Sequence, residues 1–166
     1  LLLHVPSSAD RSTPYQWTEA AGLEGPGINV GFTTTVPNGC CLWLTGHEFL
    51  IVRTGTTPKL WKYAHSMTAP VLTDITPAIF STIMAATSEN GYWAADYTNG
   101  RLYWMVGVAA AQPRLFRAPL TDPANLVEMS FTDNIAFRPG VNAVSGAGMR
   151  GLGYYGGYLW FATGGA

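Results

Sequence analysis

The stretch YWAADYTNGRLYWM, Tyr92–Met105, is the part of this chain that most clearly determines its fold. It reads as two strands joined by a turn, because aromatic and apolar residues flank the dipeptide Asn99-Gly100. Asparagine and glycine tolerate the positive φ angles that a tight hairpin turn requires. The sequence therefore predicts an antiparallel hairpin, with Leu102–Met105 in its second strand.

The residues after this hairpin extend it to four strands. A third strand is predicted over Pro113–Ala118, a turn over Thr121–Pro123 and a fourth strand over Leu126–Phe131. Glycine and proline separate similar short runs along the whole chain, which contains 19 Gly and 11 Pro. Only Pro77–Thr87 approaches a helical pattern, and its Ile and Thr content weakens that interpretation. The chain is therefore expected to be all-β.

The four-strand pattern recurs on both sides of this segment. In the earlier copy, the aligned positions are Phe49 with Leu102, Leu60 with Leu115, Trp61 with Phe116, Val71 with Leu126, and Leu72 with Val127. A shorter later copy runs over Gly151–Ala162 and places Leu159 at the position of Leu102. Repeats of about 40–50 residues with four strands each are typical of β-propellers.

Residues 92–131 resemble a YWTD repeat, the blade of the low-density-lipoprotein-receptor class B propeller. The resemblance rests on Ala95-Asp96, on Asn99–Trp104 and on Pro113–Asp122. The sequence departs from the family at Met105-Val106, where the family has Thr-Asp. The resemblance implies blades of antiparallel four-stranded sheets.

Blades of this kind stack face to face, so both faces of each sheet are expected to be buried. Near-continuous apolar runs such as Leu102–Met105 agree with this, because strands covered on both sides do not alternate. Large aromatic side chains are expected to fill the space between sheets. That role is assigned to Trp43, Trp61, Trp93, Trp104 and Trp160.

The expected architecture is an incomplete ring of two propeller-like blades and part of a third. The blades are predicted over residues 40–88, 89–140 and, in part, 141–166, within a repeat region 39–166. Residues 1–38 are expected to form an extended N-terminal arm with one strand near Ile28–Val36. Because a ring needs about four to eight blades, the chain is expected either to be a fragment or to assemble with other chains. A β-sandwich is the alternative fold.

The composition limits the classes of partner. Charged residues make up 11% of the chain, against about 25% in an average soluble domain. The formal net charge is −1, and the basic residues form no cluster, so a nucleic-acid partner is not expected. No apolar run approaches the roughly 20 residues of a membrane-spanning helix, and membrane insertion is not expected. Such compositions are common in secreted β-proteins, virion components and assembled subunits.

Known catalytic and cofactor-binding motifs are missing from the sequence. The three histidines lie far apart, and neither a calcium loop nor a phosphate-binding loop occurs. Ser145 has Ala143 where the nucleophile elbow of hydrolases requires glycine. No catalytic residue, metal site or cofactor is therefore assigned.

Aromatic and turn residues remain as candidates for binding. Tyr97, Tyr154, Tyr155 and Tyr158 lie near predicted turns, and His47 lies at a predicted hairpin tip. A flat amphipathic ring contacts a sugar or a protein at low entropic cost. The same rings could instead pack against neighbouring blades or subunits.

The sequence thus favours a non-catalytic binding or assembly module that recognises protein or glycan. It would be a subunit or fragment of a larger extracellular or virion-surface structure, with other protein subunits as partners in a homo-oligomer or larger assembly. The alternatives are a propeller-type glycan hydrolase or lyase, and a purely structural lattice protein.

Overall fold

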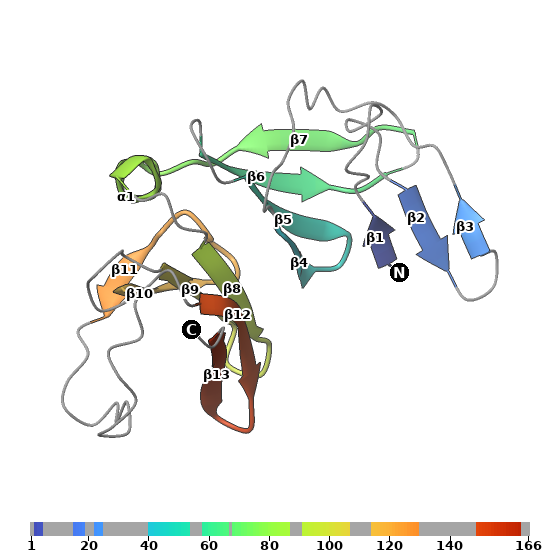
Figure 1. Ribbon diagram of the computed structural model, residues 1–166. Coiled ribbons are helices and arrows are strands. Elements are labelled where there is room, and N and C mark those ends of the chain that lie inside the picture. Colours follow the sequence, from blue (N-terminus) through green and yellow to red (C-terminus); the bar gives the residue numbers. More distant parts are fainter. Residues whose placement is uncertain are drawn as a thin grey trace.

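The structure is a computed structural model. It describes residues 2–4, 15–18, 22–24, 40–53, 58–66, 68–86, 91–106, 114–129 and 149–163. These residues form mostly β-strands and one short helix (Figure 1). Two of the sheets are four-stranded and antiparallel. The all-β class predicted from the sequence is therefore confirmed.

The first four-stranded sheet has its strands in chain order. They are β4 (Cys40–Thr45), β5 (Glu48–Arg53), β6 (Lys59–Ala64) and β7 (Val71–Asp74). Each strand runs antiparallel to its neighbour. The turn Gly46-His47 joins β4 to β5, and Gly46 has a φ of 52°. This positive φ is the one that two-residue hairpin turns require.

A helix, α1 (Ala78–Ala86), follows the first sheet. It lies in the one segment whose sequence approached a helical pattern. Phe80, Ile83 and Met84 are buried in the main core, and their spacing of three and four residues places them on one side of a helix. Packing of this side therefore outweighs the weak helical preference of the Ile and Thr residues.

The second four-stranded sheet contains the hairpin predicted at Tyr92–Met105. Its strands are β8 (Gly91–Asp96), β9 (Arg101–Val106), β10 (Arg114–Pro119) and β11 (Val127–Met129), again paired in chain order. The turn over residues 97–100 joins β8 to β9, and Gly100 has a φ of 63°. The predicted hairpin is therefore confirmed.

Two smaller sheets complete the described residues. A hairpin is formed by β12 (Met149–Tyr155) and β13 (Tyr158–Thr163), joined by the turn Gly156-Gly157. Near the N-terminus, β1 (Leu2–His4), β2 (Tyr15–Thr18) and β3 (Gly22–Glu24) form a three-stranded antiparallel sheet. The expectation of one strand in residues 1–38 was therefore wrong. The strand predicted near Ile28–Val36 lies outside the described residues.

The two four-stranded sheets share the main core, as their adjacent positions in Figure 1 suggest. The first sheet and α1 contribute Leu44, Leu50, Val52, Leu60, Phe80, Ile83 and Met84. The second sheet and the loop before β11 contribute Trp93, Leu102, Trp104, Val106, Phe116, Ala118 and Leu126. The ring of Trp104 is central, because it lies against three other aromatic rings at centroid distances of 4.7–5.7 Å.

The opposite face of the second sheet is covered by the β12–β13 hairpin. Its residues Tyr103, Met105 and Leu115 are buried against that hairpin. The hairpin contributes Leu152, Tyr154, Leu159 and Phe161. Since the second sheet is covered on both sides, all five residues of Leu102–Val106 are buried. This explains why β9 reads as a continuous apolar run.

Only some of the tryptophans have the predicted core role. Trp93 and Trp104 are buried, as expected, and Trp61 packs at the edge of a second cluster. Trp43 and Trp160 are 46% and 61% exposed, so neither fills the space between two sheets among the described residues, contrary to the prediction. Both lie near hairpin turns, where no neighbouring sheet covers the ring among the described residues. No helix in the described ranges is long and apolar enough to cross a membrane.

Candidate functional site

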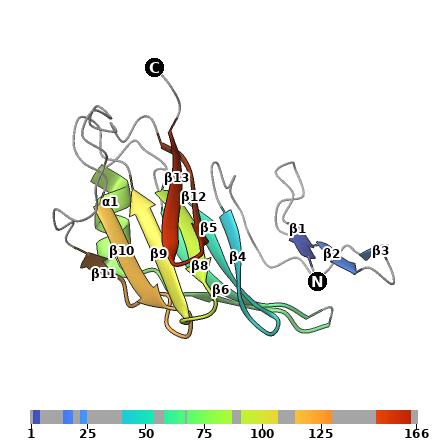
Figure 2. The same ribbon diagram turned by 90° about the horizontal axis from the view of Figure 1, so that it is seen from below.

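Three hairpin turns lie toward the same end of the molecule. They are Gly46-His47, residues 97–100 and Gly156-Gly157, and Figure 2 shows them pointing the same way. We call this region the turn end. The residues that the sequence pointed to for binding all lie in or beside these turns: His47, Tyr97, Tyr154, Tyr155 and Tyr158. Their individual contacts differ, and these contacts decide which of them are free to bind.

Tyr97 connects the first two turns. Its hydroxyl donates a hydrogen bond of 3.0 Å to the carbonyl oxygen of Trp43, and the two rings lie 5.1 Å apart. Burial raises the pKa of the Tyr97 hydroxyl, so it stays protonated as a donor. The Trp43 ring is itself fixed, because its Nε1 donates to the carbonyl oxygen of Gly46 at 2.9 Å. Tyr97 therefore joins the two sheets while leaving half of its surface exposed.

Tyr154 connects the second and third turns. Its ring stacks on Tyr103 at 5.8 Å, and its hydroxyl is hydrogen-bonded to the carboxylate of Asp96. This carboxylate is buried and also accepts bonds from the backbone N and the Nδ2 of Asn99, at 3.1 and 2.7 Å. Tyr154 is thus a packing residue that ties the hairpin to the second sheet.

The charge of Asp96 is held inside this network. Burial opposes its ionisation, but the hydrogen bonds from Asn99, Tyr154 and the backbone of Thr98 outweigh that effect and lower its pKa. The carboxylate is therefore ionised at neutral pH and acts as a fixed acceptor. Its bonds to the turn are the local kind that Asp commonly makes.

His47 is exposed in the first turn. Its carbonyl oxygen accepts a 2.8 Å hydrogen bond from the backbone N of His65. The His65 ring is buried, with its Nδ1 2.9 Å from the hydroxyl of Tyr63. Burial, and to a smaller extent the nearby His47, lower the pKa of His65. In the part of the chain that the structure describes, no three His, Cys, Asp or Glu side chains are grouped as metal ligands.

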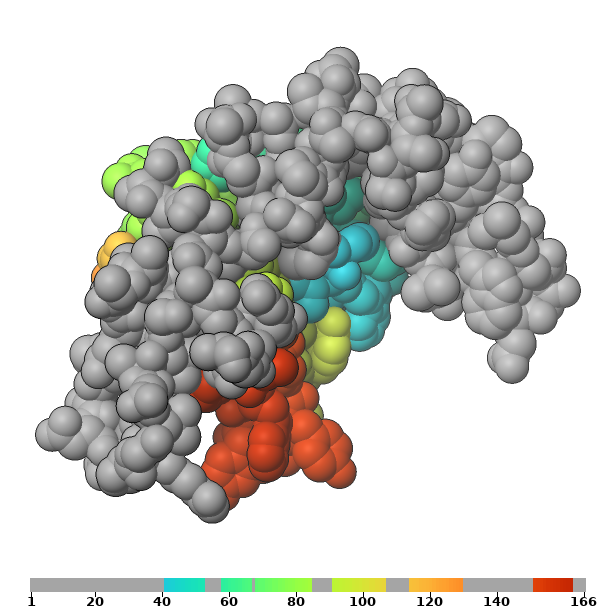
Figure 3. All heavy atoms as spheres, in the orientation of Figure 1, coloured from blue at the N-terminus to red at the C-terminus, as the bar shows by residue number. Residues whose placement is uncertain are grey.

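Tyr155 is the most exposed of the predicted residues, at 80%, and it does not stand alone. Tyr158 and Trp160 lie on the same outward side of the hairpin and are 69% and 61% exposed. Trp160 Nε1 donates to the carbonyl oxygen of Tyr155 at 3.2 Å, which fixes the indole ring. We call these three residues the outer aromatic face. Figure 3 shows the hairpin (red) standing out at the lower edge of the molecule.

The sequence pointed to Tyr158 as a binding candidate but not to Trp160. The signal was nevertheless present in the period of two along Tyr158–Phe161. In that run, Leu159 and Phe161 pack inward on the second sheet, so the two residues that alternate with them face outward. Assigning Trp160 to the space between sheets hid this alternation.

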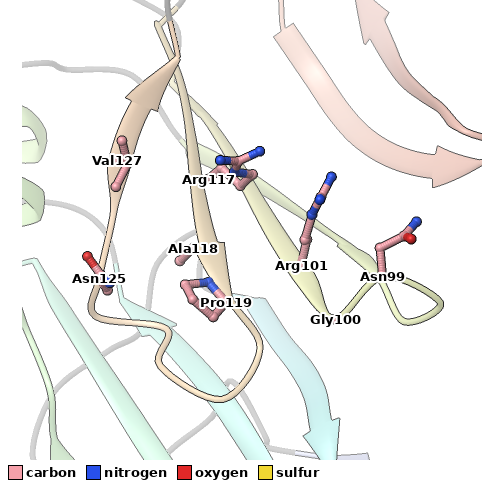
Figure 4. A pocket seen from close by; sticks show the side chains of 8 residues that line it. All are labelled: Asn99, Gly100, Arg101, Arg117, Ala118, Pro119, Asn125 and Val127. Atoms are coloured by element: carbon pink, nitrogen blue, oxygen red, sulfur yellow. The ribbon is translucent and has the colours of Figure 1, made fainter.

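A second feature of the turn end is a hollow of about 350 Å³ in the second sheet (Figure 4). Arg101 and Arg117 line it from β9 and β10. The remaining lining residues are Asn99, Gly100, Ala118, Pro119, Asn125 and Val127. None of these eight residues was among the binding candidates taken from the sequence. No sequence motif indicates that two isolated arginines lie on one side of a sheet.

Ion pairs occupy matching places in the two four-stranded sheets. Lys59 Nζ lies 2.6 Å from Asp74 Oδ2, and Arg114 binds Glu128 through Nε and Nη2, each at 2.7 Å. In the first sheet, Asp74 faces Trp61, and Lys59 lies two residues before Trp61. In the second sheet, Glu128 faces Phe116, and Arg114 lies two residues before Phe116. The two sheets therefore correspond position by position over their third and fourth strands.

This register corrects one part of the sequence alignment. Lys62 faces Thr73, and Arg117 faces Val127. The counterpart of Leu72 is therefore Leu126, and the alignments of Val71 with Leu126 and of Leu72 with Val127 were each wrong by one residue. The side chains agree, since Leu126 packs in the core whereas Val127 is 53% exposed.

Comparison with protein-family models, with curated proteins and with solved structures gives no match. The likeness of residues 92–131 to YWTD repeats therefore stays a prediction.

Proposed function

We propose that this chain is a non-catalytic assembly and binding module built from propeller-like blades. In this proposal, the two four-stranded sheets are successive blades and the β12–β13 hairpin is the start of a third. The outer aromatic face of the hairpin packs against a further β-sheet, supplied by a second copy of the chain. The observation that carries the proposal is the exposure of Trp160 at a position that is buried in both preceding sheets.

The equivalence of these positions follows from the faces of three strands. The second residues of β5, β9 and β13 are Phe49, Leu102 and Leu159. Leu102 faces the first sheet and Leu159 faces the second sheet. Each of these two strands thus turns its second residue toward the unit that precedes it in the chain.

The third residue of each strand points the other way. Leu50 of β5 is buried against the second sheet, and Tyr103 of β9 is buried against the hairpin. The same position in β13 is Trp160, which is 61% exposed. The stacking that covers Leu50 and Tyr103 therefore supports a further sheet over Trp160.

The size of the exposed face supports a protein partner. A large aromatic side chain buries about 150–250 Å² when fully covered, so three of them offer several hundred Å². A standard interface buries about 800 Å² on each partner. The outer aromatic face would supply a large part of such an interface, and exposed apolar patches of this size commonly mark interaction sites.

The location of the module is also part of the proposal. The low charged fraction, 11%, supports an extracellular or virion-surface structure in which much of each subunit is covered by its neighbours. A surface with few charges remains soluble less readily as a monomer. Assembly would remove the apolar part of that surface from water.

Light scattering and native mass spectrometry over a range of protein concentrations test the proposal. The wild-type chain is expected to have the mass of two or more copies, each of 17.8 kDa. Trp160→Ser is expected to shift the population toward the monomer, because it removes the largest ring of the outer aromatic face. Circular dichroism verifies that the variant remains folded.

Trp43→Ser is the matched control. Trp43 is also an exposed tryptophan whose Nε1 is bonded to a turn carbonyl oxygen, but it lies on the first sheet. This variant is expected to keep the wild-type mass. A wild-type chain that remains monomeric at every concentration, or equal loss of assembly in both variants, contradicts the proposal.

A further inference from the structure

Two arginines of the second sheet converge on the hollow at the turn end. Arg101 faces Pro119 across the sheet and Arg117 faces Tyr103, so the two arginines are diagonal neighbours on one side. Diagonal neighbours are about 7–8 Å apart, and Figure 4 shows both side chains rising from the same side of β9 and β10. Both are exposed, and neither has an ion-pair partner among the residues that the structure describes.

In the first sheet, the two positions that correspond to Arg101 and Arg117 hold an ion pair. Glu48 faces Ala64, and Lys62 lies two residues before Ala64. Glu48 and Lys62 thus correspond to Arg101 and Arg117. In the first sheet, Lys62 Nζ lies 3.2 Å from Glu48 Oε1. The second sheet has a cation where the first has this carboxylate, so two positive charges line the hollow and none of its lining residues is acidic.

The rest of the lining is suited to a sugar ring. Asn99 and Asn125 bring amide groups that can both donate to and accept from hydroxyl groups. Pro119 and Val127 bring exposed apolar surface for the C–H side of a ring. A volume of about 350 Å³ is at the lower end of the range for small-molecule sites, about 300–1,000 Å³. It suits one sugar residue better than a peptide segment.

We propose that this hollow binds an acidic sugar residue through its carboxylate. The carboxylate lies between Arg101 and Arg117 and supplies the negative charge that Glu48 supplies in the first sheet. Guanidinium groups bind carboxylates through paired, charge-assisted hydrogen bonds. The ring hydroxyls bond to the two asparagine amides. The site does not include the outer aromatic face, so it stands independently of the assembly proposed above.

Titration of the full chain with D-glucuronate, followed by NMR or calorimetry, tests the site. Glucuronate is expected to bind, and glucose, which has the same ring without the carboxylate, is expected to bind at least about tenfold more weakly. Arg101→Gln and Arg117→Gln are each expected to weaken glucuronate binding by about tenfold or more, since each removes charge-assisted hydrogen bonds. Lys62→Gln removes the same charge at the matching position of the first sheet and is expected to leave binding unchanged.

Arg101→Glu gives the sharpest result. It places a carboxylate next to Arg117 in the arrangement that Glu48 and Lys62 already have. The variant is expected to lose glucuronate binding while keeping the circular dichroism spectrum of the folded wild type, although its new carboxylate also faces Asp96 across the strand pair. Loss of binding with the fold retained separates an occupied site from a misfolded one.

Four results would overturn the proposal. These are absence of glucuronate binding, equal binding of glucose, unchanged glucuronate affinity in both arginine variants, and an equal loss in Lys62→Gln. Glucose 6-sulfate and N-acetylglutamate are the remaining probes. If glucose 6-sulfate binds more tightly than glucuronate, the site recognises a sulfate group and not a carboxylate. If N-acetylglutamate binds more tightly than glucuronate, the ligand is an acidic peptide and not a sugar.

Discussion

Gly91 lies where the backbone of β8 passes close to the Nε1 edge of the indole ring of Trp104. A Cβ atom at Gly91 would collide with Nε1 of this ring, and Trp104 is fully buried among other aromatic rings. The ring cannot move without displacing its neighbours. We therefore expect Gly91→Ala to lower the free energy of unfolding by about 1–3 kcal/mol, the usual cost of overpacking, as measured by urea titration.

Gly153→Ala is the control for this prediction. Gly153 is also in a strand, β12, but a Cβ atom there would meet nothing within 4 Å. Its substitution is expected to change the free energy of unfolding by less than about 0.5 kcal/mol. Equal effects of the two substitutions would show that the packing around Trp104 is not the cause.

Asp96 gives a prediction about pH. Its pKa in the folded chain lies below the ordinary value of 3.8. A carboxyl group with a lowered folded pKa stabilises the fold above its unfolded pKa, and this contribution is lost as pH falls through the folded pKa. We expect the free energy of unfolding to decrease as pH falls below about 4.

Asp96→Asn isolates this contribution. The variant is expected to be less stable at pH 7 and to lose less stability on acidification, because one of the responsible groups is absent. The dependence on pH will not vanish, since Lys59 and Thr76 lower the pKa of Asp74 to about 2 against the effect of its burial. Urea titrations of both proteins between neutral and acid pH make the comparison, and parallel curves would argue against this role of Asp96.

The predicted binding residues show how far single residues can be interpreted from the sequence. His47, Tyr97, Tyr154 and Tyr155 were placed correctly in or beside turns, because Gly and Asn identify turns locally. Their exposure was not predictable in the same way. Tyr97 is held by Trp43 and Tyr154 by Asp96, and both partners lie more than 50 residues away in the sequence. Only the fold brings these partners together.

At the scale of elements, the matching ion pairs give a test of equivalence between the two sheets. The side chains of Lys59 and Asp74, and those of Arg114 and Glu128, are 38–45% exposed. Exposed pairs of this kind contribute about 0.2–1 kcal/mol. We expect double-mutant cycles with Lys59→Gln and Asp74→Asn, and with Arg114→Gln and Glu128→Gln, to give favourable coupling of this size in both sheets.

The geometry of the Arg114–Glu128 pair should affect the coupling energy measured in that experiment. Arg114 makes two bonds to Glu128 and also lies over the ring of Phe116 at 5.1 Å. Its coupling is expected to equal or exceed that of Lys59 with Asp74. A cycle between Lys59 and Glu128, which lie in different sheets, is expected to show none. Coupling in only one sheet would contradict the equivalence.

The sequence predicted the strands well, but it predicted the helix between the sheets and the exact register of the strands less well. The hairpin at Tyr92–Met105 was predictable because Asn99-Gly100 is a strong local turn signal. α1 was not, because the burial of Phe80, Ile83 and Met84 that stabilises it is a tertiary effect. The one-residue error at Leu72 arose because both copies have two apolar residues in a row, and only the partner strand decides which of the two faces inward.

At the scale of the whole molecule, the face-to-face stacking of successive sheets is the feature that connects the fold with the proposed function. The main core lies between the two four-stranded sheets, and a second core lies between the second sheet and the hairpin. Continuous apolar strands in the sequence predicted sheets that are covered on both sides. The sequence could not show that the outward side of the hairpin carries Tyr155, Tyr158 and Trp160, since exposure there depends on what lies beyond the hairpin.

The most direct measurement of the central claim is hydroxyl-radical footprinting of the tryptophan and tyrosine side chains as the protein concentration rises. If a further sheet covers the outer aromatic face, Tyr155, Tyr158 and Trp160 will become protected together as assembly proceeds, while Trp43 remains as reactive as in the monomer. Constant reactivity of these three residues across the assembly transition would show that the chain assembles through another surface and would contradict the proposed stacking.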